Sequence, residues 1–112
     1  MLSWSSTEDG HPAELSAIAD GSGDGGLPHG AELLAFTDAA AGFDDAALAD
    51  ARARLVAAAG EAFMVDAAAV IANFEMMTRV ADGTGARFPA ETADQRADVA
   101  ARLGITSFTS AR

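Results

Sequence analysis

Apolar residues recur at helical spacing along most of the chain, and no segment shows a convincing alternation of apolar and polar positions. This pattern predicts helices over residues 30–41, 44–59, 62–82 and 90–103, with a shorter helix after Pro12. Glycine follows the helices as a stop signal, at Gly42, Gly60, Gly83 or Gly85, and Gly104. We therefore expect an all-α fold, a small bundle of about four to five helices with a long central helix at about 62–82.

The ends of these helices carry residues that suit them. Pro12 fits the first position of a helix because it has no N–H to leave unpaired, and Glu14 follows in the first turn. Asp44 can cap the helix that follows Gly42. We divide the chain into a flexible N-terminal segment with a short helix (1–28), a helical domain (29–104) and a C-terminal tail (105–112).

The long helix has two unlike sides. Residues placed 100° apart gather one mostly apolar side, whose central positions are Asp66, Val70, Asn73, Met77 and Val80. Glu75, Thr78, Arg79 and Asp82 form the other side. Glu75 and Arg79 are four residues apart in the favourable order. We expect this polar side to be a solvated, charge-paired surface, with contact to another polar element as the alternative.

Two polar residues interrupt the apolar side of the long helix. Asp66 is close enough to the helix start to meet unpaired backbone N–H groups, or to lie near the preceding helix. A buried amide without partners costs about 1 to 3 kcal/mol, so Asn73 must bond to another helix or to a neighbouring subunit. We favour a structural amide that fixes the register of the helices, and a ligand-binding amide is the alternative.

The composition favours self-association. Half of the 112 residues are apolar, but most of these are alanine, which favours helix and buries little surface. A single copy would have a thin core. We therefore expect the helices to pack against a second copy, giving a homo-oligomer.

Charge and residue content exclude several functions. The formal charge of −10 disfavours binding to nucleic acid and to anionic lipid. Cysteine is absent, which rules out thiol redox chemistry by this chain alone. Asp66, Asn73, Glu75 and Arg79 would be costly inside a bilayer, and the N-terminus lacks the pattern of a secretory signal. We expect a cytoplasmic protein that does not enter membranes.

Motifs for metals and cofactors are incomplete. The stretch GSGDGG matches the dinucleotide-binding pattern Gly-x-Gly-x-x-Gly, but no strand precedes it. Read as a calcium-binding loop that starts at Asp20, it has Ala31 at the twelfth position, where an acid is needed, and Glu32 comes one residue too late. His11 with Glu14, and His29 with Glu32, have a spacing that could approach one metal, but helix-start chemistry explains both pairs. We expect no cofactor and no metal.

The stretch VDAAAVIANFEMMTRVADGTG, residues 65–85, resembles the C-terminal helix of alkylhydroperoxidase-like proteins of the carboxymuconolactone decarboxylase superfamily. The shared pattern is an Asp-Ala start, a central Asn-Phe, an Arg-Val-Ala-Asp and a closing glycine. The preceding helix, AALADARARLVAAAG, is also similar, and the resemblance covers about residues 31–88. It implies an all-helical fold and assembly into oligomers.

This chain lacks the catalytic residues that the family's peroxidase members use. The resemblance implies that peroxidase members carry a Cys-x-x-Cys pair with a nearby His and Glu in an earlier helical hairpin. Here there is no cysteine, and we expect too little room before Gly30 for the full hairpin, so no catalytic residue can be carried over. Thiol peroxidase activity is not expected. We expect a non-catalytic, self-associating protein. The alternatives are an enzyme or small-ligand binder, and partnership with a protein that supplies the missing hairpin. If the chain is an enzyme or small-ligand binder, we expect its site to form between subunits from His29, Glu32, Asp66, Asn73 and Arg79.

Overall fold

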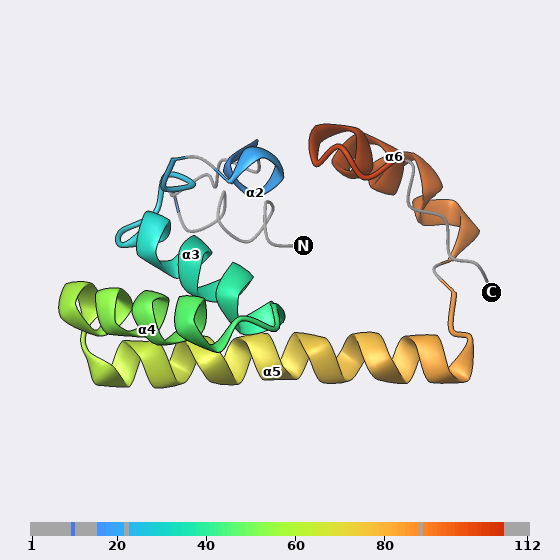
Figure 1. Ribbon diagram of the computed structural model, residues 1–112. Coiled ribbons are helices and arrows are strands. Elements are labelled where there is room, and N and C mark those ends of the chain that lie inside the picture. The colour runs from blue at the N-terminus through green and yellow to red at the C-terminus, as the bar shows by residue number, and fades with distance from the viewer. Residues whose placement is uncertain (1–9, 11–15, 22, 88, 107–112) are drawn as a thin grey trace.

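The computed structural model describes residues 10, 16–21, 23–87 and 89–106 (Figure 1). Its elements are α2 (Ser16–Asp20), α3 (Gly30–Ala41), α4 (Asp45–Ala59), α5 (Glu61–Thr84), the 3-10 turn η1 (Ala90–Thr92) and α6 (Ala93–Arg102). All regular structure in these residues is helical, which confirms the all-α fold. Pro12 and Glu14, the predicted start of the first helix, lie outside the described residues, as does most of the predicted C-terminal tail.

Helices α3 and α4 begin and end where the sequence predicts. The side chain of Asp44 accepts hydrogen bonds from the backbone N–H groups of Ala46 and Ala47, both at 3.0 Å. These bonds satisfy donors that the first turn of α4 cannot pair internally. Gly42 follows the last residue of α3, and Gly60 adopts a positive φ of 92° between α4 and α5.

The C-terminal helices differ from the prediction in detail. Helix α5 continues through Gly83 and ends at Thr84; the next residue, Gly85, caps it with a φ of 69°, the left-handed conformation that glycine accepts most readily. The last predicted helix begins as the 3-10 turn η1 after Pro89. There the Thr92 hydroxyl donates to the Pro89 carbonyl, and α6 follows.

The core lies where α3, α4 and the first half of α5 pack together (Figure 1). Phe36, Ala51 and Leu55 are its buried centre, and the Leu55 side chain is fully enclosed. Half-buried residues surround this centre, namely Ala39, Leu48, Ala59, Met64, Ala67 and Ile71. Since a third of the buried centre is alanine, the core is thin, as the composition predicts.

The chain is more open than a compact monomer of its size. It exposes 8352 Å², whereas a compact protein of this mass exposes about 5,700 Å². Its radius of gyration is 15.4 Å, against about 13 Å for a compact domain of this length. The second half of α5 projects beyond α3 and α4, and α6 packs on η1 rather than into the bundle (Figure 1).

Candidate functional site: the outer face of α5 and its groove

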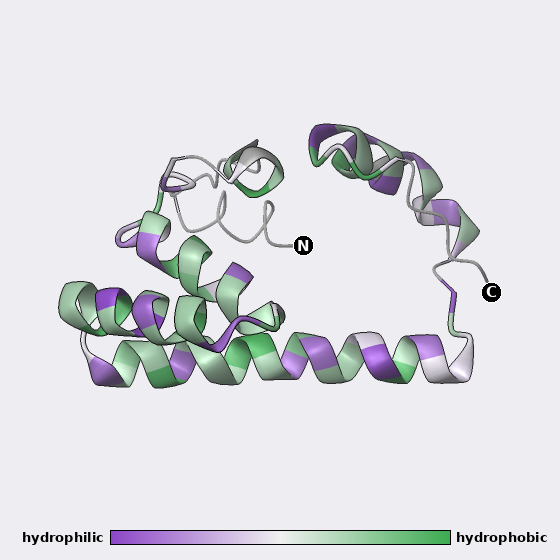
Figure 2. Cartoon of the chain, viewed as in Figure 1, coloured by the Kyte–Doolittle hydropathy of each residue, from purple (hydrophilic) through white to green (hydrophobic). Residues whose placement is uncertain are grey.

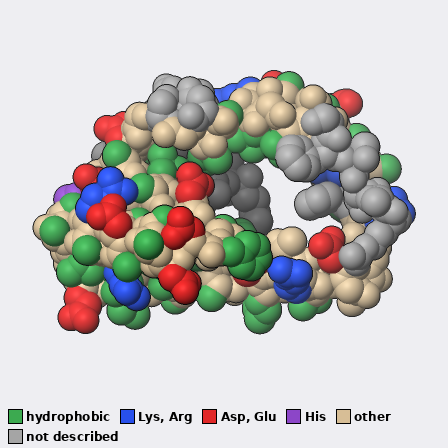
Figure 3. All heavy atoms as spheres, viewed as in Figure 1, with side chains coloured by type: hydrophobic (Ala, Val, Ile, Leu, Met, Phe, Trp, Pro, Cys, Tyr) green, Lys and Arg blue, Asp and Glu red, His purple; other side chains and the backbone are tan. Residues whose placement is uncertain are grey.

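Helix α5 presents a long apolar surface to solvent. Val65, Val70, Phe74, Met76, Met77 and Val80 are each between 53% and 58% exposed. Placed 100° apart, all of them except Phe74 lie with Ala62, Ala69 and Asn73 on the side of α5 away from Ile71, which packs on the core; Phe74 lies at the border of this side, toward Ile71. We call these nine residues the outer face. Beyond the part that α3 and α4 cover, hydrophobic residues alternate with polar ones along α5 (Figure 2). Hydrophobic and charged side chains are likewise mixed over the face of the molecule seen in Figure 3.

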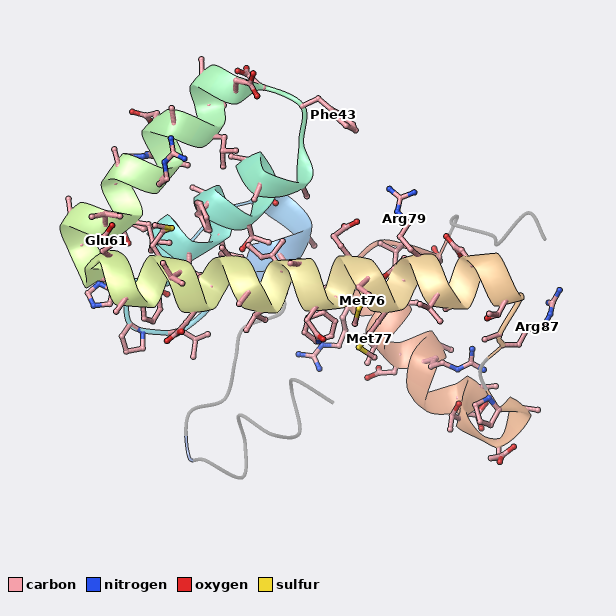
Figure 4. All side chains as sticks on the ribbon, turned by 90° about the horizontal axis from the view of Figure 1, so that it is seen from below. Phe43, Glu61, Met76, Met77, Arg79 and Arg87 are labelled. Carbon is pink, nitrogen blue, oxygen red and sulfur yellow. The ribbon has the colours of Figure 1, made fainter. Side chains whose placement is uncertain are left out.

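The side of α5 that packs on the bundle is a different one. Met64, Ala67 and Ile71 contact the core, and the same side of the helix continues with Glu75 and Thr78. Glu75, Thr78, Arg79 and Asp82 are exposed, as the sequence pattern predicts for the polar side. Met76 and Met77 point to one side of α5 and Arg79 to the opposite side (Figure 4).

Asn73 does not form the bond to another helix that the sequence led us to expect. Its side chain is exposed, and its Nδ2 donates to the Sδ atom of Met77, one turn along the same helix, at 3.7 Å. The expectation was wrong for a single copy because the apolar side that carries Asn73 faces away from α3 and α4. A bond to a neighbouring subunit stays a prediction.

A groove of about 560 Å³ runs between α3 and α5, along one edge of the outer face. Leu33 lines it from α3, and Phe63, Val70, Ile71 and Phe74 line it from α5. Thr37 also lines the groove, but its hydroxyl already donates to the Leu33 carbonyl at 2.8 Å. Two carboxylates, those of Asp66 and Glu75, are the charged groups of the lining.

The five predicted ligand-binding residues converge only in part. Asp66 lines the groove, and the His29 ring lies edge-on to Phe63, a lining residue, with ring centroids 6.2 Å apart. Glu32 is half-buried in the first turn of α3. Asn73 and Arg79 are not part of the groove lining. Of the five residues, Asp66 alone belongs to the groove lining, and His29 lies against a lining residue without being part of the lining itself.

A second, shallower pocket lies between α3 and α4. Asp38, Asp44, Asp50 and Arg54 line it, around a volume of about 390 Å³. Asp44 is engaged in capping α4, and Asp50 pairs with Arg54 at 3.3 Å, both side chains being mostly exposed. These contacts are explained by helix structure, so the pocket offers no arrangement for chemistry.

The part of the chain that the structure describes holds neither a metal-binding cluster nor a membrane-spanning helix. Within the described ranges, no three His, Cys, Asp or Glu side chains lie close enough together to hold a metal ion. His11 and Glu14, one of the two predicted pairs, lie outside those ranges. Among the helices that the structure describes, none has both the length and the apolar character to cross a bilayer.

Comparison with known proteins adds no relative. The chain matches no family model, no curated protein and no solved structure. The resemblance to alkylhydroperoxidase-like proteins therefore stays an expectation based on the residues of α4 and α5.

Proposed function

We propose that this chain is a non-catalytic helical protein that self-associates through the outer face of α5, and that it is related to alkylhydroperoxidase-like proteins. One observation carries the proposal: six large apolar side chains on one helix face are more than half exposed in a single copy. Contiguous apolar surface of this kind marks an interaction site in soluble proteins. Burying it would supply the stabilisation that the thin core lacks.

The amount of uncovered surface supports this proposal. The chain exposes 8352 Å², about 2,600 Å² more than a compact monomer of its mass. A standard protein interface buries about 800 Å² on each partner. This excess belongs to the whole chain, and among the described residues most of the exposed large apolar side chains lie on α5. A partner on α5 would also cover Asn73 and give its amide the neighbour that the single copy does not provide.

The alternative is a small-ligand site between subunits, and the groove between α3 and α5 is the feature that favours it. Asp66 and Glu75 are carboxylates in a mostly apolar wall, and Val70 and Phe74 belong to both the groove and the outer face. A second copy on the outer face would therefore roof one edge of the groove. Enclosure of an apolar pocket with one or two polar groups is typical of small-ligand sites.

Light scattering during size-exclusion chromatography of the full chain tests the proposal. We expect the mass to be a multiple of the monomer mass of 11.3 kDa at micromolar concentration. A mass that stays monomeric at the highest accessible concentration would overturn the proposal. A stable homo-oligomer would also count against the idea that a different protein supplies a missing hairpin. Binding of apolar dyes that requires the oligomer and Asp66 would favour the ligand alternative.

A further inference from the structure

We infer that two copies pair their α5 helices in antiparallel orientation, about a two-fold axis near Asn73. This inference rests on the proposed self-association and gives it a geometry, with a second copy of this chain as the occupant of the outer face. Isologous pairing of one patch with itself is the commonest arrangement in homo-oligomers. The distribution of side-chain size and charge along α5 selects the orientation.

The two halves of the outer face differ in side-chain size. Before Asn73 the outer face holds two alanines and two valines, Ala62, Val65, Ala69 and Val70, and after Asn73 it holds the larger Phe74, Met76 and Met77 together with Val80. With the axis at Asn73, antiparallel pairing sets Met77 of one copy against Ala69 of the other and Met76 against Val70, while Val80 faces Asp66. The bulkier half of each face therefore meets the less bulky half of the other. Parallel pairing would place alanine on alanine and leave a gap at one end.

Charge selects the same orientation. Asp66 lies among the residues of the outer face and is exposed in the single copy. Parallel pairing would bring the two Asp66 carboxylates together on a surface that is losing water, which is unfavourable for like charges. Antiparallel pairing about Asn73 separates them by about 21 Å along the axis, well beyond the screening length of about 8 Å at physiological salt. Opposed helix dipoles add to this preference.

Asn73 lies where the axis would pass. Its Nδ2 bonds to the thioether of Met77, and a thioether sulfur is a weak acceptor. A primary amide carries both a strong donor and a strong acceptor, so two Asn73 side chains facing across a two-fold axis can bond to each other. A buried asparagine at one position also fixes register and orientation in paired helices. This accounts for a polar residue at the middle of an apolar face.

Spin-label distance measurements on the full-length chain test this geometry. Because the chain has no cysteine, Glu61→Cys and Ala72→Cys each give one label per copy. Both positions are exposed and lie outside the nine residues of the outer face. Antiparallel pairing predicts a short distance between the two labels at residue 72. At residue 61 the labels would be about 36 Å apart along the axis.

Each other outcome has a defined meaning. Equally short distances at both positions, in a sample whose mass is dimeric, would show parallel pairing and overturn the inference while leaving self-association intact. Long distances at both positions in a dimer would show that another surface is used. An absence of dipolar coupling in a sample of monomeric mass would overturn both the inference and the proposed function.

Discussion

Replacing the two adjacent methionines of the outer face is the sharpest perturbation of the proposed interface. Met76 and Met77 are 57% and 54% exposed in the single copy. Glutamine is close to methionine in length and in helix propensity, so Met76→Gln with Met77→Gln keeps α5 intact. The substitutions remove two apolar groups from the interface and add amides that lose water on association. They should therefore weaken the dimer without unfolding the chain.

The size of the effect follows from the exposed fractions. Burying a methionine side chain fully contributes about 1.5 to 3 kcal/mol, and about half of each side chain is already covered in the single copy. Each methionine therefore contributes about 1 kcal/mol to pairing. A two-fold dimer contains four of them, giving about 4 kcal/mol. At 1.4 kcal/mol per factor of ten, the dissociation constant rises about a thousandfold.

Sedimentation equilibrium over a concentration series measures this change directly. The matched control is Glu75→Gln with Thr78→Gln, which places the same new residue twice on the other side of α5. We expect the control to sediment like the unaltered chain and the methionine variant to dissociate at concentrations where the chain is dimeric. Equal dissociation of both variants, or of neither, would refute the assignment of the outer face as the interface.

Three further predictions concern the fold, each checked by urea unfolding at one fixed protein concentration. Leu55→Ala should lower the free energy of unfolding by about 2 to 5 kcal/mol, and Leu48→Ala by less, because Leu55 is fully enclosed and Leu48 is half-buried; equal losses would contradict the described core. Asp44→Ala should cost about 1 kcal/mol through loss of the α4 cap, and an unchanged midpoint would show that the cap is not formed. Gly30→Ala should cost about 1 to 3 kcal/mol, because the added Cβ would collide with the backbone carbonyl of Asp24; a neutral result would show that this loop yields.

The helix positions could be predicted from local chemistry. Glycine at 42, 60 and 85 and the cap at Asp44 act within one turn of the chain, so their effects can be inferred without knowing the tertiary structure. The choice between Gly83 and Gly85 was not decided, because glycine inside a helix is only modestly unfavourable. In the structure, α5 continues through Gly83 and ends at Thr84, just before Gly85.

The packed side of α5 was harder to predict. The longest apolar stripe includes Val70, Met77 and Val80, and it suggested that Asn73 would be buried. In the structure a shorter patch, Met64, Ala67 and Ile71, contacts the core, because α3 and α4 cover only the first half of α5. Periodicity shows which residues share a side of a helix, but it does not show which side meets a neighbour when both are apolar.

The candidate site could be predicted only in fragments. The sequence pattern marks Asp66 as a polar residue on an apolar side, and Asp66 does line the groove. The pattern marks His29 by its spacing to Glu32, whereas the observed neighbour of His29 is the ring of Phe63. The partners of His29 lie on a helix more than thirty residues away in sequence. Contacts of that kind depend on how helices cross, which the sequence pattern alone does not encode.

The central claim is that a second copy covers the outer face of α5. Oxidative footprinting of methionines at increasing protein concentration tests it most directly, because Met76 and Met77 lie on that face while Met64 is half-buried in the bundle. We predict that oxidation of Met76 and Met77 slows several-fold as concentration rises, while that of Met64 stays constant. Rates at Met76 and Met77 that do not change with concentration would contradict the account.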